Sequence, residues 1–374
     1  MDEAARRRDI PLERATTLPA SWYAADDHHE LELERIFRHG WSCVGVTDDV
    51  ATPGSYHATT VAGAVPIVLT RDFEGRLRGF VNVCRHRGAP VAQGTGSARL
   101  LQCPYHAWIY RLDGSLARAG GMDGAEDFRT DDFGLAEVAV ATWARFVFVC
   151  PTPVPAVPAF DAGPLARAIE PYGLEGFDLA IREHTVRNFN WKVMVENYSE
   201  NFHTPWIHPE LIVNGWDYPI VTDGPVSLAW DRPLHPRNAV EETLANSHPT
   251  DAAWASVTGA QVDDVFIGGL YFTLLPNLLV SAFPRYVSAF WLTPAGPRST
   301  RVDYVRLWHP DVDDDRRKAD HEASTRVGDQ DLDICEAVQR GYNAGIDTRG
   351  RLSPVHERGV AHVHRLLAQA LDHN

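Results

Sequence analysis

The sequence of 374 residues lacks a long apolar run. No segment approaches the roughly 20 apolar residues that a membrane helix requires. The polar start, MDEAARRRDI, has no apolar stretch behind it that would mark a signal peptide. Cysteine is also scarce, because five widely spread residues do not make the even framework of a secreted disulfide-rich domain. We therefore expect a cytoplasmic protein without a membrane anchor.

Positive charge is in short supply, with 35 Lys and Arg against 50 Asp and Glu and a formal net charge of −15. Binding to a phosphate backbone needs clustered Lys and Arg, so we expect no nucleic-acid partner. The G-x-G-x-x-G fingerprint of dinucleotide-binding proteins and the P-loop are both missing. Any nicotinamide or flavin chemistry must then come from another protein.

The hydrophobic pattern predicts an α+β chain in three parts. Residues 1–40 contain an amphipathic helix at 26–38. Residues 41–150 carry short β-rich runs between Gly and Pro turns, at 64–70, 79–84 and 145–150. The Pro-rich segment 151–158 then marks a boundary. Residues 151–374 are predicted to form an antiparallel sheet with helices, with strands at 186–190, 272–275, 278–283, 287–292 and 301–307 and helices at 193–203, 320–342 and 354–371.

Two short pairs of metal-binding residues stand in the β-rich part, namely Cys84-Arg85-His86 and Cys103-Pro104-Tyr105-His106, with sixteen residues between them. Thiolate and imidazole ligands suit iron or zinc. Zinc sites usually pair Cys with Cys and His with His. One Cys and one His in each pair instead suit a binuclear cluster, in which one iron takes two sulfurs and the other takes two nitrogens. A structural zinc site remains the alternative.

This motif, with Pro104, Tyr105 and Trp108 in the run CPYHAW, resembles the Rieske family. The resemblance implies a [2Fe–2S] cluster with Cys84 and Cys103 on one iron and His86 and His106 on the other. Imidazole ligands raise the potential of such a cluster. Tyr105 and the backbone around Gly88 are expected to donate hydrogen bonds to the sulfurs.

A second group of candidates is the run ENYSENFHTPWIHPE, with Glu200, His203 and His208. On a helix, Glu200 and His203 share a face. His208 is five residues beyond His203, and we expect Pro205 to end the helix so that the chain turns and brings His208 back. Ordinary surface or core residues remain the alternative reading.

Asp331 is a third candidate ligand on the predicted C-terminal helix. At about 100° per residue it shares a face with apolar residues, whereas Asp329 and Asp333 point away. That face is formed by Ile334, Cys335, Val338 and Tyr342. A carboxylate on an apolar face is costly unless it is paired or metal-bound. Two His and one Asp make the facial triad of non-haem Fe(II) oxygenases.

The spacing from Asn190-Trp191-Lys192 through Glu196-Asn197 to His208-Pro209 also resembles the catalytic domain of Rieske oxygenase α-subunits. The resemblance implies a helix-grip-like domain and a mononuclear iron on His203, His208 and Asp331. It implies a homotrimer in which Glu200 links this iron to a Rieske histidine of a neighbouring subunit. Asn197 is a further catalytic candidate, while Glu196 matches no ligand position.

We therefore expect a terminal oxygenase that uses O₂ and electrons from NAD(P)H, delivered by a separate ferredoxin, flavin reductase or both. The phrase ENYSENFHTPWIHPEL most resembles family members that act on betaines and carnitine, so a small quaternary ammonium substrate is expected. Aromatic-ring hydroxylation or O-demethylation is an alternative, and a Rieske electron-transfer protein is an alternative of another class. A cage for a methylated cation could come from a set that equally suits a sheet core, namely Phe272, Phe283, Tyr286, Phe290 and Trp291.

Overall fold

The computed structural model describes residues 10–152, 157–209, 216–217, 220–230, 232–233, 270–283, 285–346 and 349–372. The chain folds into two compact units. The first, here the mixed unit, comprises Met1–Glu32 and Asp161–Asn374, and the second, the β unit, comprises Leu33–Phe160. Within the described ranges, no helix combines the length and the apolar character that crossing a membrane demands.

The boundaries between the two units follow Glu32 and Phe160, and not residues 40 and 150 as predicted. The helix α3 (Asp26–Glu32) belongs to the mixed unit, and the π-helical turn η2 (Leu33–Phe37) that continues it belongs to the β unit. At the other end, the Trp41 indole donates to the Pro158 carbonyl at 2.9 Å and meets Phe160 edge-on at 5.5 Å. These contacts fasten 157–160 to the β unit.

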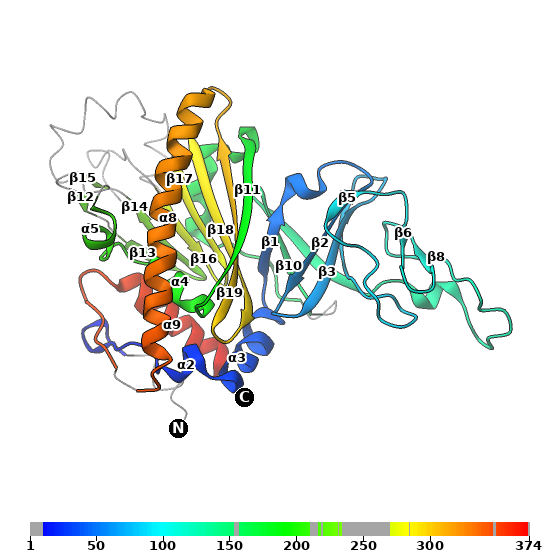
Figure 1. Cartoon of the computed structure of the whole chain (residues 1–374), viewed down its shortest axis with the longest axis horizontal. Helices are drawn as coiled ribbons and strands as arrows, with labels where there is room; N and C mark the ends of the chain where they lie inside the picture. The colour runs from blue at the N-terminus through cyan, green and yellow to red at the C-terminus, as the bar shows by residue number, and fades with distance from the viewer. Residues whose placement is uncertain are drawn as a thin grey trace. The chain divides into compact units, whose positions relative to one another are not determined.

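The β unit is built on a seven-stranded antiparallel sheet and a three-stranded one. Figure 1 labels most of its strands. In spatial order the large sheet contains β1 (Ser42–Val46), β10 (Phe146–Cys150), β9 (Glu137–Trp143), β4 (Leu77–Val81), β3 (Val65–Arg71), β2 (Ser55–Val61) and β5 (Thr95–Ser97). The small sheet contains β6 (Leu101–Gln102), β7 (Ile109–Tyr110) and β8 (Leu116–Arg118). Short 3₁₀ turns lie at η3 (Thr47–Val50) and η4 (Thr130–Phe133).

The mixed unit contains a second seven-stranded antiparallel sheet, here the large catalytic-side sheet. In spatial order it is β11 (Asp178–Arg187), β19 (Ser299–Trp308), β18 (Tyr286–Gly296), β17 (Leu278–Phe283), β16 (Leu270–Leu274), β14 (Val226–Trp230) and β13 (Ile220–Asp223). A two-stranded ribbon pairs β12 (Trp216–Asp217) with β15 (Arg232–Pro233). The strands predicted after residue 270 are all present. The strand expected at 186–190 overlaps only the last two residues of β11, which ends at Arg187, so this prediction was wrong for 188–190.

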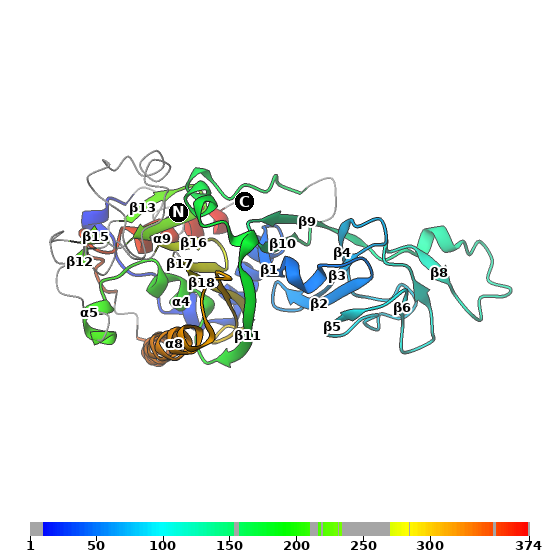
Figure 2. The same cartoon turned by 90° about the horizontal axis from the view of Figure 1, so that it is seen from above.

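Helices cover this sheet. The long α8 (Asp314–Tyr342) runs across one face of it, with α4 (Trp191–Tyr198) between helix and sheet (Figures 1 and 2). The remaining helical elements are η1 (Leu12–Arg14), α2 (Ser21–Ala24), η5 (Pro164–Tyr172), η6 (Leu174–Gly176), α5 (Thr204–Ile207) and α9 (Arg358–Leu371). Helix α8 begins at Asp314 because the Asp313 side chain caps it by accepting from the Arg316 amide.

The side chains of the large catalytic-side sheet alternate between two faces. The Tyr198 hydroxyl at the end of α4 bonds the Ser281 hydroxyl, and the Arg306 guanidinium bonds the Asp320 carbonyl of α8 at 2.9 Å. Ser281 and Arg306 therefore lie on the face that α4 and α8 cover, which we call the helix-covered face. The other face carries the apolar core, with Val280, Val287 and Val305 fully buried.

A buried ion pair joins the N-terminal helix to α4. Lys192 Nζ lies 2.5 Å from Glu32 Oε1, and both side chains are fully buried. The second oxygen of Glu32 accepts from the Trp191 indole at 2.9 Å, and Asn190 Oδ1 accepts from Lys192 at 2.7 Å. The Lys192 ammonium and the Trp191 indole thus both have partners, and α4 is fixed where the candidate site begins.

We expect Glu32→Ala to lower the free energy of unfolding by about 3–5 kcal/mol, because it leaves the buried Lys192 ammonium without its carboxylate. Urea unfolding followed by tryptophan fluorescence measures the change. Glu30→Ala is the matched control, since Glu30 lies on the same helix and is exposed. Equal stability of the two variants would contradict the structural role of the pair.

Candidate functional site

Three side chains of the mixed unit meet, two from the ends of α5 and one from α8. His208 Nε2 lies 3.0 Å from Asp331 Oδ1, and His203 Nε2 lies 3.3 Å from the same oxygen. The ligand atoms of the three all lie within 4.8 Å of one another. In the described part of the chain no other group of three or more His, Cys, Asp or Glu side chains converges in this way.

The local chain path differs from the one expected. Helix α4 ends at Tyr198, so Glu200 and His203 stand in the following turn and not on a helix. Our prediction of a helix over 193–203 was wrong at this end. The Ser199 hydroxyl bonds back to the Val195 carbonyl at 2.7 Å, and the Ser199 carbonyl lies so close to Gly359 of α9 that a Cβ there would stand only 2.0 Å from it. Packing against α9 therefore ends the helix.

Pro205 also acts differently from the prediction. It does not terminate a helix but occupies the first turn of the short helix α5, a position where its missing amide costs no hydrogen bond. The His208 amide closes this turn on the Thr204 carbonyl at 2.9 Å. One helical turn from His203 thus brings His208 to Asp331.

Each of the two imidazoles is fixed by a hydrogen bond at its Nδ1 atom. His203 Nδ1 lies 2.6 Å from Glu200 Oε1, and His208 Nδ1 lies 2.7 Å from Gln330 Oε1. Each ring therefore turns Nε2 toward Asp331. Histidines that bind metals usually donate their other N–H to an oxygen in this manner. The donor set and its backing fit a non-haem iron. Gln330 was missed from the sequence, although its place beside Asp331 on α8 was a usable signal.

Electrostatic coupling within the group is strong. Burial would lower the pKa of His203, but hydrogen bonds and charges from Asp331 and Glu200 outweigh it and raise this pKa to about 9. Burial opposes ionisation of Asp331 as well, yet the two histidines hold its pKa below the usual value. The Asp331 carboxylate and the two imidazoles converge on one place, and a positive charge there stabilises the group.

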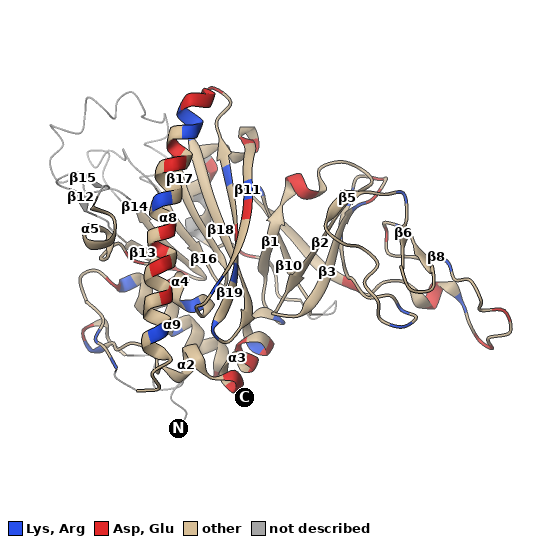
Figure 3. Cartoon of the chain, in the orientation of Figure 1, with Lys and Arg blue, Asp and Glu red and all other residues tan. Residues whose placement is uncertain are grey.

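Asp331 lies where the helical phase predicted. Its side chain is 15% exposed, whereas Asp329 and Asp333 are 59% and 73% exposed and reach Arg187. Acidic residues recur along the length of α8 (Figure 3), so position on the helix and not residue type singles out Asp331. The predicted apolar face was wrong at Val338, which is exposed.

The four candidate cluster ligands of the β unit lie on two loops. Cys84 and Cys103 are buried in the core, while His86 and His106 are exposed and their rings stand 4.5 Å apart. Together they do not form a compact group of the kind found at Asp331, in the part of the chain that the structure describes. A single zinc ion would draw four ligands to one point. The wider set suits two irons, of which Cys84 and Cys103 would hold one and the exposed His86 and His106 would hold the other.

Residues 174–373 match the ring-hydroxylating alpha subunit family (catalytic domain), and residues 40–129 match the Rieske [2Fe-2S] domain. The first match covers more than half of the chain. The chain belongs to the Rieske oxygenase α-subunit family. It is therefore a Rieske non-haem iron oxygenase, with a [2Fe–2S] cluster and a mononuclear iron as cofactors. The expected α+β fold with antiparallel sheets is confirmed, and the zinc-site and electron-carrier alternatives are excluded.

Several characterised proteins resemble this oxygenase along nearly its whole length. Choline monooxygenase of Arabidopsis thaliana is 30% identical over 96% of this chain and 83% of its own. The glycine betaine monooxygenase oxygenase subunit of Chromohalobacter salexigens is 30% identical over 92% of this chain and 83% of its own. Among solved structures, the quaternary ammonium Rieske monooxygenase CntA in complex with L-carnitine aligns with a TM-score of 0.80 at 26% identity, covering 98% and 97% of the two chains.

A hydrogen bond to the sulfur of Cys84, a candidate cluster ligand, comes from a residue that the sequence did not single out. Tyr110 Oη lies 3.2 Å from Cys84 Sγ and accepts from the Arg85 amide at 2.9 Å. Burial and the neighbouring sulfur raise the pKa of Tyr110, so its hydroxyl keeps the proton that it donates. Tyr105, which we expected in this role, is 53% exposed and lies against His106 with ring centroids 3.8 Å apart. The Gly88 amide donates to the Cys84 carbonyl.

We expect Tyr110→Phe to lower the reduction potential of the oxygenase's Rieske cluster by roughly 60 mV. A hydrogen bond to sulfur stabilises the more negative reduced cluster, and one such charge-assisted bond corresponds to about a tenfold change in a one-electron equilibrium. Redox titration followed by EPR measures it. Tyr105→Phe is the control, with an unchanged potential. A shift in the control but not in Tyr110→Phe would reverse the assignment.

The aromatic residues of the large catalytic-side sheet divide by face. Phe272 and Trp291 are buried on the core face, since Phe272 pairs with Val280 and Trp291 with Leu278. Phe283, Tyr286 and Phe290 alternate with them and lie half-buried on the helix-covered face. The half-buried Tyr198, Tyr271 and Tyr304 share that face or approach it. The sequence did not single these three out.

Two remaining candidates lie near the end of α4. Asn197 is half-buried there. The carboxylate of Glu196 accepts from the Tyr23 hydroxyl at 2.5 Å and lies 3.0 Å from His364 Nε2. Glu196 thus belongs to a contact between α4, the N-terminal segment and α9, which explains why it matches no ligand position.

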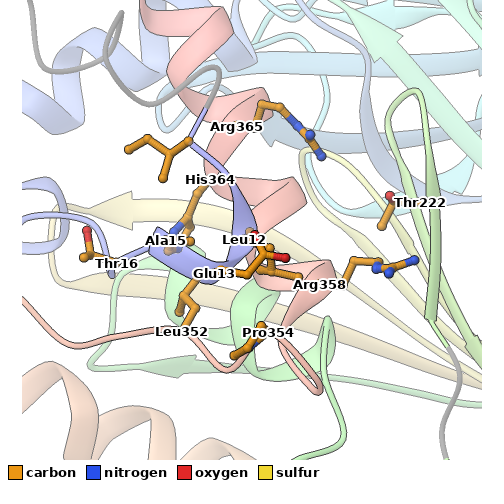
Figure 4. Close-up of a pocket in the computed structure, with 12 residues that line it drawn as sticks. Leu12, Glu13, Ala15, Thr16, Thr222, Leu352, Pro354, Arg358, His364 and Arg365 are labelled. Atoms are coloured by element: carbon orange, nitrogen blue, oxygen red, sulfur yellow. The ribbon is translucent and has the colours of Figure 1, made fainter.

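A separate cavity of about 390 Å³ opens beside α9 (Figure 4). His364, Arg358 and Arg365 of α9 line it together with Leu12 and Thr16 of the N-terminal segment. None of His203, His208 and Asp331 contributes to its wall. We therefore do not assign the oxygenase reaction to this cavity.

Proposed function

We propose that this oxygenase hydroxylates or oxidatively N-demethylates a small quaternary ammonium compound. Half-buried aromatic rings carry the proposal, because they lie on the helix-covered face, the side of the sheet on which α8 carries Asp331. Tyr198 and Phe290 approach each other at 6.5 Å, and Phe290 and Tyr304 at 4.9 Å. Electron-rich ring faces attract a methylated cation, which has no hydrogen-bond donor to satisfy. The named activities of the choline and glycine betaine relatives support the same class.

The proposed iron ligands are His203, His208 and Asp331, and the proposed cluster ligands are Cys84, His86, Cys103 and His106. When bound, the mononuclear iron supplies an open position at which O₂ is activated. The chain's own residues prepare this position. Glu200 and Gln330 hold the two imidazoles with Nε2 turned inward, and the aromatic rings place the N-methyl carbon near that point and exclude water.

Electrons are proposed to come from NAD(P)H through a separate ferredoxin, flavin reductase or both, since the chain has no dinucleotide fingerprint. We further propose a cytoplasmic homotrimer. Inter-subunit electron transfer has been described for CntA, and a closed head-to-tail ring is the symmetry that pairs one subunit's Rieske unit with its neighbour's mixed unit. In this arrangement the exposed His86 or His106 of one subunit reaches Glu200 of the next.

Metal analysis and a substrate panel test the proposal. The purified protein should hold about three irons and two labile sulfides per chain. With a surrogate reductase, choline, glycine betaine or L-carnitine should stimulate NADH consumption and release formaldehyde or a hydroxylated product. Stimulation only by aromatic acids or methoxylated aromatics would overturn the substrate class in favour of ring hydroxylation or O-demethylation.

A further inference from the structure

Arg306 is a buried cation on the helix-covered face. It is 1% exposed, and its guanidinium donates to the Asp320 carbonyl at 2.9 Å and to the Ser288 hydroxyl at 2.7 Å. It also lies over the rings of Tyr286, Tyr304 and Trp308 at 4.8–5.9 Å. Its Nε–H is buried and bonds to no acceptor within the described residues.

No carboxylate balances this charge among the residues that the structure describes. A second deeply buried cation, Lys192, shows a balanced site, because Glu32 meets it at 2.5 Å. Burying a charge is expensive unless it is paired and hydrogen-bonded. Arg306 has five donors and meets only neutral oxygens and ring faces. A bound carboxylate would supply both the missing negative charge and acceptors for the remaining N–H donors of Arg306.

Strand register places Arg306 in one row with two serines of the helix-covered face. Ser281 pairs with Ser288, and Ser288 pairs with Arg306, so the three form one row across β17, β18 and β19. The first member of the row is bonded to the Tyr198 hydroxyl. Two strand spacings separate Ser281 from Arg306, about 10 Å. Burial and, to a lesser extent, the charge of Asp331 raise the pKa of Tyr198. The row therefore leads from the partner of a residue near the proposed iron site to the guanidinium.

We propose that Arg306, with Ser288, binds the carboxylate of the substrate, so that this oxygenase acts on zwitterionic quaternary ammonium compounds and not on cationic ones. The proposal rests on the proposed function above. The carboxylate and the ammonium group of the substrate are thereby directed to opposite ends of the site. The guanidinium, which lies over the ring faces of Tyr286 and Tyr304, repels a second cation, while Asp331 and Glu200 supply negative charge at the other end. The ammonium group and its methyl carbons then lie at the iron end.

The first experiment uses the wild-type holoenzyme under anaerobic conditions, with calorimetric titration of matched probes. Glycine betaine is compared with choline, and L-carnitine with its methyl ester. We expect at least one carboxylate to bind roughly 10- to 100-fold more tightly than its matched partner without the negative charge, the range of a charge-assisted hydrogen bond. Equal binding within each pair would overturn the proposed role of Arg306 but would leave the proposed substrate class standing. Binding of none of the four would overturn the quaternary ammonium substrate class, and this inference with it.

Variants then separate binding from a purely structural role. Arg306→Gln should abolish the preference for the carboxylate, Arg306→Lys should restore part of it, and Ser288→Ala should weaken it with little effect on folding. Arg301→Gln is the matched control, because Arg301 lies on the same strand and is already paired with Asp303 at 2.7 Å. A structural clamp between β19 and α8 would instead lower the melting temperature and weaken all four probes alike, leaving the preference intact. That outcome would overturn the proposal.

Discussion

Asp331→Ala is expected to lower the iron content of the purified oxygenase from about three atoms per chain to about two, with about two labile sulfides retained. Asp331 is the one carboxylate of the group, and both histidine Nε2 atoms face its Oδ1. Without it the site has two neutral imidazoles, too few to hold Fe(II) against dilution, and turnover falls at least about 100-fold. The EPR signal of the reduced Rieske cluster should persist.

Asp329→Ala is the control for this experiment. It removes the same carboxylate from the same helix two residues earlier, where the side chain is 59% exposed and 3.4 Å from Arg187. Iron content and turnover should remain at wild-type levels. If Asp331→Ala retained the third iron, or if Asp329→Ala lost it, the assignment of the ligand by helical phase would be wrong.

Helical phase could identify Asp331 because α8 is long and regular. At 100° per residue, one of three neighbouring acids had to face inward with Cys335, and the structure shows that it does. The same argument failed for Val338 because it treats the whole face as buried. The buried stripe passes instead through Leu332, Cys335 and Gln339.

The turn between α4 and α5 could not be predicted from local sequence. The sequence predicts a helix that runs to His203, but α9 approaches so closely at Gly359 that the helix ends at Tyr198. This contact joins residues about 160 apart in the sequence. The local sequence favours Pro205 as the end of a helix, whereas in the structure it stands in the first turn of the helix α5.

The hydrogen-bond partners of the candidate ligands could not be predicted from the sequence either. Tyr105 stands inside the CPYHAW motif, yet Tyr110, on strand β7, reaches Cys84. Both tyrosines follow Cys103 closely, and only the fold of the small sheet distinguishes them. Arg306 was invisible for the same reason. A single arginine in a predicted strand is ordinary until the register shows which face it occupies.

Glu200→Ala is expected to slow reoxidation of the reduced Rieske cluster by O₂ at least about 100-fold, while iron and sulfide contents remain close to normal. One carboxylate oxygen of Glu200 lies 2.6 Å from His203 Nδ1, so the residue stands directly behind an imidazole of the proposed iron site. Its side chain is 12% exposed, which leaves an edge for the proposed contact with a neighbouring subunit. Single-turnover stopped-flow absorbance measures the reoxidation rate.

Glu200→Gln divides this role into two parts. Its amide oxygen can still accept from the His203 Nδ1–H, so if orientation of that ring is the whole function, the variant should behave as wild type. If Glu200 also couples the two metal centres through its charge, the rate should stay low although the ring is held. Glu196→Gln is the control, since Glu196 lies on the last turn of α4 but faces Tyr23 and His364. Fast reoxidation in Glu200→Ala would remove the residue from the electron path, and equal slowing in Glu196→Gln would assign the effect to the packing of α4.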